Sequence, residues 1–148
     1  MLLIKKVGVY INILNCRLKK HFAEVFKNKD INLTAEQYLV MDTLWDEGVL
    51  SQQAIANIIQ KDKNSVTQFI DTLERKNLVL RQPDGRDKRV NNIAVTSIGQ
   101  GLKEKTTDVA ISTMEEVLQG IPEEKLTVFV EVLYQINKNI DRLGKLKS

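Results

Sequence analysis

The sequence has little of the chemistry that enzymes and metal sites use. Among 148 residues there is one cysteine, Cys16, and one histidine, His21. A lone cysteine excludes a disulfide within the chain and a cysteine-based zinc site, and a lone histidine removes most metal-binding and catalytic-triad arrangements. No glycine-rich phosphate loop is recognisable. The sequence therefore argues against an enzyme and predicts no catalytic residue, metal or cofactor.

Long hydrophobic stretches are also missing. No run of about 18 apolar residues occurs, which is the length a membrane span needs. The N-terminus lacks the charged, apolar and small-residue order of a signal peptide. Aromatic residues make up only 5% of the chain, which favours helices over sheet. We therefore expect a soluble, cytoplasmic and mainly helical protein.

Positive charge is unevenly spread along the chain. The net charge is only +3, but residues 61–89 hold eight basic and five acidic residues, whereas residues 30–60 hold five acidic residues and no basic one. Both chain ends are basic as well. This distribution is compatible with a polyanionic partner, although solvated helix faces with uneven charge give similar counts.

Hydrophobic periodicity and capping signals predict the order of elements. Apolar residues at three- and four-residue spacing indicate a long helix over residues 4–28. Thr34 to Gln37 has the form of a capping box, Ser51 and Asp62 suit the N-cap position, and Asn77 suits a left-handed helix end. We expect further helices from these caps, a two-stranded wing over 79–82 and 90–95, a long helix from Thr96, and a last helix from Pro122.

This order is typical of a winged helix-turn-helix within residues 34–99. The flanking regions, residues 1–30 and 100–148, carry broad apolar stripes that a lone helix leaves uncovered. A second copy of the chain would cover them, so we expect a single cooperative unit of 148 residues with a helical dimerisation region. The alternative is that these helices fold back on the central lobe.

Candidate DNA contacts lie on two helices. If Val66, Phe69, Ile70 and Leu73 face inward, the opposite face carries Lys63, Asn64, Thr67, Gln68 and Asp71. Amide, hydroxyl and ammonium groups of these kinds read base edges when a recognition helix enters the major groove. Ser51, Gln52 and Gln53 open the preceding helix and suit a phosphate, although Ser51 could equally be a plain N-cap.

A third group of candidates lies at the tip of the predicted wing. Arg86, Lys88 and Arg89 cluster among turn-forming residues, where long cationic side chains can extend into a minor groove. Asp87 could hold the Arg89 guanidinium in one orientation by a paired salt bridge. The alternative is an exposed ion pair without a function.

Five motifs together resemble the MarR-type transcriptional regulators, over essentially the whole chain. They are Leu33-Thr34-x-x-Gln37-Tyr38, the Asp62 cap, Leu73-Glu74-Arg75-Lys76-Asn77-Leu78-Val79, Asp87-x-Arg89, and Val95-Thr96-x-x-Gly99. The resemblance implies a mainly α winged-helix homodimer with a small β-wing, whose recognition helices bind successive major grooves of a pseudo-palindromic operator. It places the family's wing contacts on Asp87 and Arg89, and its recognition-helix contacts on Lys63, Asn64, Ser65, Thr67 and Gln68.

The chain departs from this family pattern at two positions. Many members have glycine where Asn77 stands, and asparagine also tolerates the left-handed conformation. Many have arginine where Gln68 stands, so the base preference of the family does not carry over to this chain.

The resemblance also implies a pocket for a small-molecule effector, but the sequence shows no ligand signature. Tyr10, Cys16, His21, Tyr38 and Trp45 could line such a pocket or simply belong to the core. Some members sense peroxides through a cysteine on the first helix. Counted back from Leu33, their sensing position falls nearer Tyr10 than Cys16, and a lone buried cysteine is usually inert packing.

Two functions from different classes remain after these exclusions. The first is a sequence-specific DNA-binding regulator, a repressor released by a small ligand, of which a redox-responsive regulator acting through Cys16 is a variant. The second is a winged-helix protein-interaction module that no longer binds DNA. The basic wing and the polar recognition helix favour the first.

Overall fold

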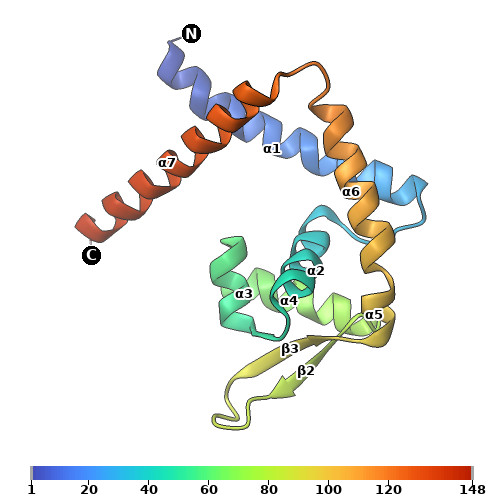
Figure 1. Cartoon of the computed structure of the whole chain (residues 1–148). Coiled ribbons are helices and arrows are strands. Elements are labelled where there is room, and N and C mark those ends of the chain that lie inside the picture. Colours follow the sequence, from blue (N-terminus) through green and yellow to red (C-terminus); the bar gives the residue numbers. More distant parts are fainter. Residues whose placement is uncertain (1, 148) are drawn as a thin grey trace. The chain divides into compact units, whose positions relative to one another are not determined.

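The computed structural model describes residues 2–147 and shows a mainly α-helical chain with a small antiparallel sheet (Figure 1). The chain divides into two compact units, residues 1–113 and 114–148. The first contains α1 (Leu3–Asn28), α2 (Ala35–Glu47), β1 (Leu50–Ser51), α3 (Gln52–Ile59), α4 (Lys63–Arg75), β2 (Val79–Pro83), β3 (Asn91–Val95) and α5 (Ser97–Gly101). Helix α6 (Lys103–Val117) runs across the boundary, and α7 (Glu123–Lys147) belongs to the second unit. No described helix is long and apolar enough to cross a membrane.

Local capping signals fix where three of the helices begin. The Thr34 hydroxyl accepts a hydrogen bond from the Gln37 amide at 3.1 Å, and the Gln37 side chain accepts one from the Thr34 amide at 3.1 Å. Ser51 and Asp62 accept from the amides three residues further on and so cap α3 and α4. The predicted capping box and both predicted N-caps are confirmed.

The core lies in the first unit, between α2, α3, α4, the sheet and the C-terminal end of α1. Fully buried apolar side chains such as Phe26, Met41 and Ile70 fill it. Phe22, Phe26 and Tyr38 form an aromatic group that joins α1 to α2, with Phe26 edge-on to both neighbours. Packing of this kind gives the central lobe, residues 34–99, its fixed arrangement.

The sheet has three strands in the order β1-β3-β2, all antiparallel. The two predicted strands of the wing are present as β2 and β3. The third strand, β1, was not predicted, and its residues Leu50 and Ser51 pair with Ile93 and Asn92. A strand of two residues has no periodicity that a sequence could reveal. Its pairing ties the start of α3 to the wing.

The turn between α4 and β2 lies very close to the backbone of α5. Asn77 adopts φ 62°, the left-handed conformation that was predicted to end α4. A Cβ at Gly99 would lie 2.2 Å from the Leu78 carbonyl oxygen, so only glycine fits there. The Trp45 indole N–H also donates to the Gly99 carbonyl at 3.3 Å.

The long helix expected from Thr96 is instead divided into α5 and α6. Thr96 caps α5 as predicted, but the Leu102 amide turns back to the Gly99 carbonyl at 3.2 Å. Two glycines within five residues, Gly99 and Gly101, lower helix propensity at this point and favour the break. Ile98 on α5 is exposed.

The long terminal helices leave many apolar side chains exposed. On α1 they include Val7, Ile11 and Leu14, and on α7 they include Val128, Phe129, Val132 and Ile140. Cys16 is exposed too, so of the two alternatives left open for it, the core is excluded. It lies in the middle of α1, one turn before Lys19, which pairs with Glu36 of α2.

Candidate nucleic-acid interface

Helix α4 presents a polar face because its other face is anchored in the core. Val66, Ile70 and Leu73 are fully buried, whereas Lys63, Asn64 and Gln68 are exposed and Ser65 and Thr67 are half-buried. Asp62 fixes the N-terminus by accepting from the Ser65 amide at 2.6 Å. The exposed candidates therefore lie on the first turns of the helix, as the sequence predicted.

The candidates on α3 and α4 are linked to each other. The side-chain amide of Gln52 donates a hydrogen bond to the Thr67 hydroxyl at 2.6 Å, and that hydroxyl donates one to the Lys63 backbone carbonyl at 2.9 Å. Ser51 accepts from the Ala54 amide at 3.1 Å, so it is an N-cap. Gln52 and Thr67 thus hold the two helices in register, while Lys63 extends from the start of α4.

Asp71 was expected on the outward face of α4 with the candidate DNA contacts, but it pairs with a residue of the sheet instead. Its carboxylate lies 2.6 Å from the Arg81 guanidinium, which reaches across from β2. Glu74 also pairs with Arg81, at 3.0 Å. Sequence reasoning missed Arg81, although Thr67, Asp71 and Glu74 have the three- and four-residue spacing that puts them on one side of a helix.

The wing tip is shaped by Asp84, whose role was also missed. One carboxylate oxygen accepts from the backbone amides of Arg86 and Asp87 at 3.0 and 3.1 Å, and the other accepts from the Asn92 side chain at 3.0 Å. These hydrogen bonds, first that from Asn92, hold the pKa of Asp84 below its usual value. The loop that carries Arg86, Lys88 and Arg89 therefore has a defined shape.

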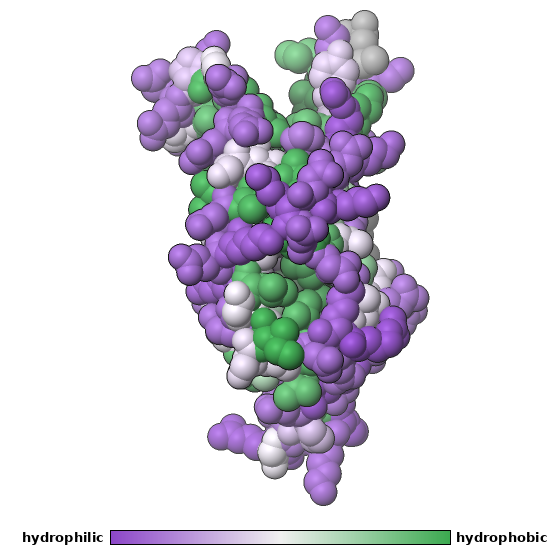
Figure 2. Space-filling view, turned by 90° about the vertical axis from the view of Figure 1, so that its right-hand side faces the viewer, coloured by the Kyte–Doolittle hydropathy of each residue, from purple (hydrophilic) through white to green (hydrophobic). Residues whose placement is uncertain are grey.

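Asp87 and Arg89 form the expected paired salt bridge. The Arg89 Nε and Nη2 atoms each lie 3.0 Å from a carboxylate oxygen of Asp87. The Asp87 carboxylate also accepts a hydrogen bond from the backbone N–H of Arg89. The salt bridge lowers the pKa of Asp87 and raises that of Arg89. The Arg89 side chain is nevertheless 90% exposed. The wing tip, at the bottom of Figure 1, lies at the bottom of Figure 2 as well and is mostly hydrophilic there.

A small recess joins the recognition helix to the wing. Its volume is about 170 Å³, and it is lined by Gln52, Gln53, Ala56, Lys63, Arg89, Val90 and Asn91. The lining combines basic and amide side chains from α3, α4 and the wing and contains no carboxylate. The fold therefore brings together candidate residues that are up to 37 positions apart in the chain, from Gln52 to Arg89.

The sequence of this region matches a known family. The family model described as "MarR family" matches residues 33–90, which span α2 to the wing tip. Over these residues the chain is similar to the MarR family.

Relatives with assigned names are helix-turn-helix regulators. This chain is 27% identical over 115 residues to the transcriptional regulator MhqR of Bacillus subtilis, covering 76% of this chain and 79% of MhqR. It is 25% identical over 114 residues to the regulator YybA of the same species, covering 77% and 76% of the two chains.

Solved structures with the same fold include complexes with DNA. A mutant MarR of E. coli bound to operator DNA superposes with a TM-score of 0.81 at 19% identity, covering 90% of this chain and 94% of that one. Overoxidized AbfR bound to DNA gives 0.75 at 25% identity, covering 93% and 94%. The winged helix-turn-helix fold expected from the sequence is thus confirmed.

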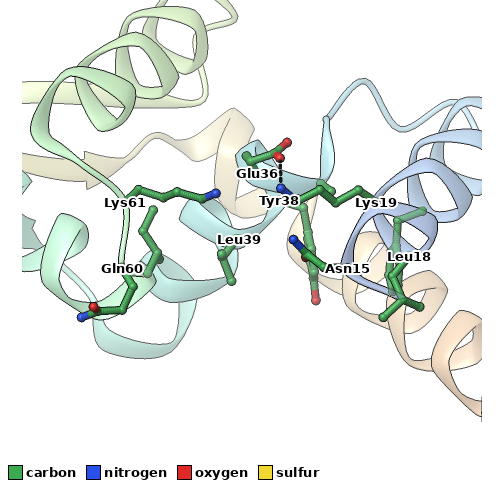
Figure 3. A pocket seen from close by; sticks show the side chains of 11 residues that line it. Asn15, Leu18, Lys19, Glu36, Tyr38, Leu39, Gln60 and Lys61 are labelled. Carbon is green, nitrogen blue, oxygen red and sulfur yellow. Dashed lines mark ion pairs between the residues drawn. The ribbon is translucent and has the colours of Figure 1, made fainter. Parts of the chain in front are cut away.

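The chain also has a larger pocket, away from the wing. It has a volume of about 390 Å³ and is lined by α1, α2 and the turn after α3 (Figure 3). Mostly apolar atoms of Leu18, Phe22, Leu39 and Ile59 form its walls, and Asn15, Gln60 and Lys61 lie at its edge. Of the five residues suggested for a ligand pocket, only Tyr38 lines it.

The structure indicates the ionisation of two polar groups in this pocket, Glu36 and Tyr38. Lys19 on α1 and Glu36 on α2 form an ion pair of 3.0 Å, drawn in Figure 3. Partial burial opposes ionisation of Glu36, but the hydrogen bond from Lys19 and backbone hydrogen bonding outweigh it and lower its pKa. Burial raises the pKa of Tyr38 to about 12. The tyrosine hydroxyl therefore remains a hydrogen-bond donor at neutral pH.

Among the described residues, no group of three or more His, Cys, Asp and Glu side chains is placed to hold a metal ion. The side chains of the candidate interface can bind a partner through charge and hydrogen bonds.

Proposed function

We propose that this protein is a MarR-family transcriptional regulator that binds double-stranded DNA sequence-specifically and acts as a repressor. The observation that carries the proposal is the pairing of an exposed polar face on α4 with a basic, preshaped wing. The names of its relatives and the DNA complexes of its structural neighbours support it. We infer a binding protein rather than an enzyme. A regulator of this kind acts in the cytoplasm, where it meets the genome.

The contacts fall into three groups by chemistry. Lys63, Asn64 and Gln68 would read base edges in the major groove, with Ser65 and Thr67 beside them. Arg89, oriented by Asp87, would enter the minor groove. Phosphates would be held by the remaining candidates, namely Ser51, Gln52, Arg86 and Lys88.

The protein would act as a homodimer. Exposed apolar side chains on α1 and α7 need a covering surface, and a second copy supplies one by symmetry. Two recognition helices related by a two-fold axis read an inverted repeat, so the operator would be pseudo-palindromic.

A small, mostly apolar effector would bind the pocket between α1 and α2. Gln60 and Lys61 at its edge form the turn that leads directly into Asp62, the cap of α4. A ligand that displaces this turn would move the recognition helix, and release from DNA would follow.

Selection from random duplexes tests the DNA-binding proposal. Purified protein is incubated with the pool at two salt concentrations, and the retained duplexes are sequenced. We expect an enriched inverted repeat with half-sites about one helical turn apart that survives the higher salt. Retention that is sequence-blind and lost at higher salt would contradict the proposal and favour a protein-interaction module.

A further inference from the structure

Arg81 is the residue through which the wing holds the recognition helix. Its Nη2 atom lies 2.6 Å from an Asp71 carboxylate oxygen, and its Nη1 atom lies 3.0 Å from a Glu74 carboxylate oxygen. Nη2 also donates to the Thr67 carbonyl at 3.3 Å, and the Arg81 backbone amide donates to Glu74 at 3.1 Å. One strand residue therefore contacts three positions along a single side of α4.

These contacts restrict how α4 can move relative to the sheet. The guanidinium is planar and presents its donors in a fixed fork, so it satisfies two carboxylates and a carbonyl in one geometry. A lysine has a point charge on a flexible stem and could not reproduce that geometry. The Arg81 clamp, meaning Arg81 with Thr67, Asp71 and Glu74, thus fixes the recognition helix against β2.

Arg81 is also poorly placed to contact DNA itself. Its side chain is 20% exposed, compared with 90% for Arg89. Both terminal nitrogens are already engaged with α4. Its charge is outweighed by the two carboxylates beside it, so the group as a whole carries a net negative charge, which does not attract phosphate.

Reading a major groove with α4 and a minor groove with the wing requires a constant angle between them. We propose that Arg81 sets this angle and is a specificity-determining positioning residue, which acts through α4 and the wing without touching DNA. The inference rests on the proposed function, because it concerns how well the two elements fit one operator at the same time.

The test compares operator DNA with random-sequence DNA. Four variants are measured against both duplexes over a series of salt concentrations: Arg81→Met, Arg81→Lys, the double variant Asp71→Asn with Glu74→Gln, and the control Arg75→Met. Arg75 is an exposed arginine on the same helix that contacts Thr72 and lies outside the clamp. Thermal unfolding followed by circular dichroism shows whether each variant folds.

We expect Arg81→Met to lower the ratio of operator to random-sequence affinity about tenfold, comparable to a mismatched base pair. The salt dependence should keep its slope, because no phosphate contact is lost. Arg81→Lys should restore only part of the ratio, and Arg75→Met should leave it unchanged.

The double variant decides between positioning and direct contact. It keeps Arg81 and removes two negative charges, so random-sequence affinity should rise while the operator ratio falls. If the double variant keeps or raises the ratio, the clamp does not set the angle and the inference is wrong. If Arg81→Met weakens binding to both duplexes equally with a shallower salt slope, Arg81 is a phosphate contact, which also contradicts the inference. Wild-type protein that shows no preference for any operator would contradict the proposed function instead.

Discussion

The central lobe and the two long terminal helices differ in how far their apolar side chains are exposed. In the lobe, residues such as Val40 and Ile70 are completely buried, and the faces left outside are polar. On α7, Phe129 remains 48% and Val130 62% exposed. The lobe therefore gains its stability from its own contacts, whereas the helices retain apolar surface that another chain can cover. If the proposed dimer forms through these helices, folding and assembly depend on separate parts of the sequence.

The largest effect should come from the lobe core. Replacing Ile70 by alanine removes a fully buried side chain from the inner face of α4. We expect a loss of about 2–5 kcal/mol in the free energy of unfolding, from lost burial and the cavity left behind. Denaturant unfolding measures it, with Val130→Ala as the matched control. An equal loss in both variants would erase the contrast between lobe and helix.

A somewhat smaller effect should appear in assembly. Phe129→Asp puts a charge on the apolar face of α7 and should weaken the dimer by about 1.5–3 kcal/mol for each copy, the value of one buried aromatic side chain. The helical content of the chain should not change. Sedimentation equilibrium measures the dissociation constant, and an unchanged dimer would mean that this face is not the interface.

A substitution on the surface of the lobe should affect operator binding and not stability. Arg89→Ala should weaken binding by about 1–3 kcal/mol and leave both melting and the dimer intact, because the side chain extends into solvent. Fluorescence anisotropy with a labelled operator gives the affinity. Unchanged affinity would remove Arg89 from the interface.

Gln68→Ala should have a more selective effect. We expect a change of about 1 kcal/mol in the preference for one base pair, with little effect on other operator positions. Competition between operators that differ at single positions measures this preference. A uniform loss on all of them would mean that Gln68 contacts the phosphate backbone.

The smallest effect should come from Cys16. Exposure makes this thiol accessible, but it lies outside the DNA-reading lobe. We expect Cys16→Ser to bind operator like the wild type, with and without hydrogen peroxide. Peroxide-induced release that the serine variant lacks would establish the redox-responsive alternative.

The fold class and local features such as helix caps could be predicted from the sequence, whereas particular contacts between distant segments could not. The capping box at Thr34 and the left-handed Asn77 involve residues within a few positions, so their patterns are visible in one short window. The Asp87–Arg89 pair was predictable for the same reason. Whether any of the candidates contacts DNA stays a prediction.

Other features depend on segments that are distant in the chain. Pairing of Leu50 with Ile93 spans more than forty residues and leaves no periodic trace in either segment. Arg81 looked like an ordinary strand residue until the fold brought it beside α4. The spacing of its partners Asp71 and Glu74 places them on one side of α4. This spacing predicts a contact with Arg81 only once β2 is known to lie against that side.

The Asp84 carboxylate gives the wing a thermodynamic property as well as a shape. It orders the loop in the unbound protein by accepting hydrogen bonds from Arg86, Asp87 and Asn92. The conformational entropy of the loop is therefore lost on folding and need not be lost again when a ligand is bound. Calorimetry on Asp84→Ala would accordingly find a more unfavourable association entropy than for the wild type, even where the same atoms make contact.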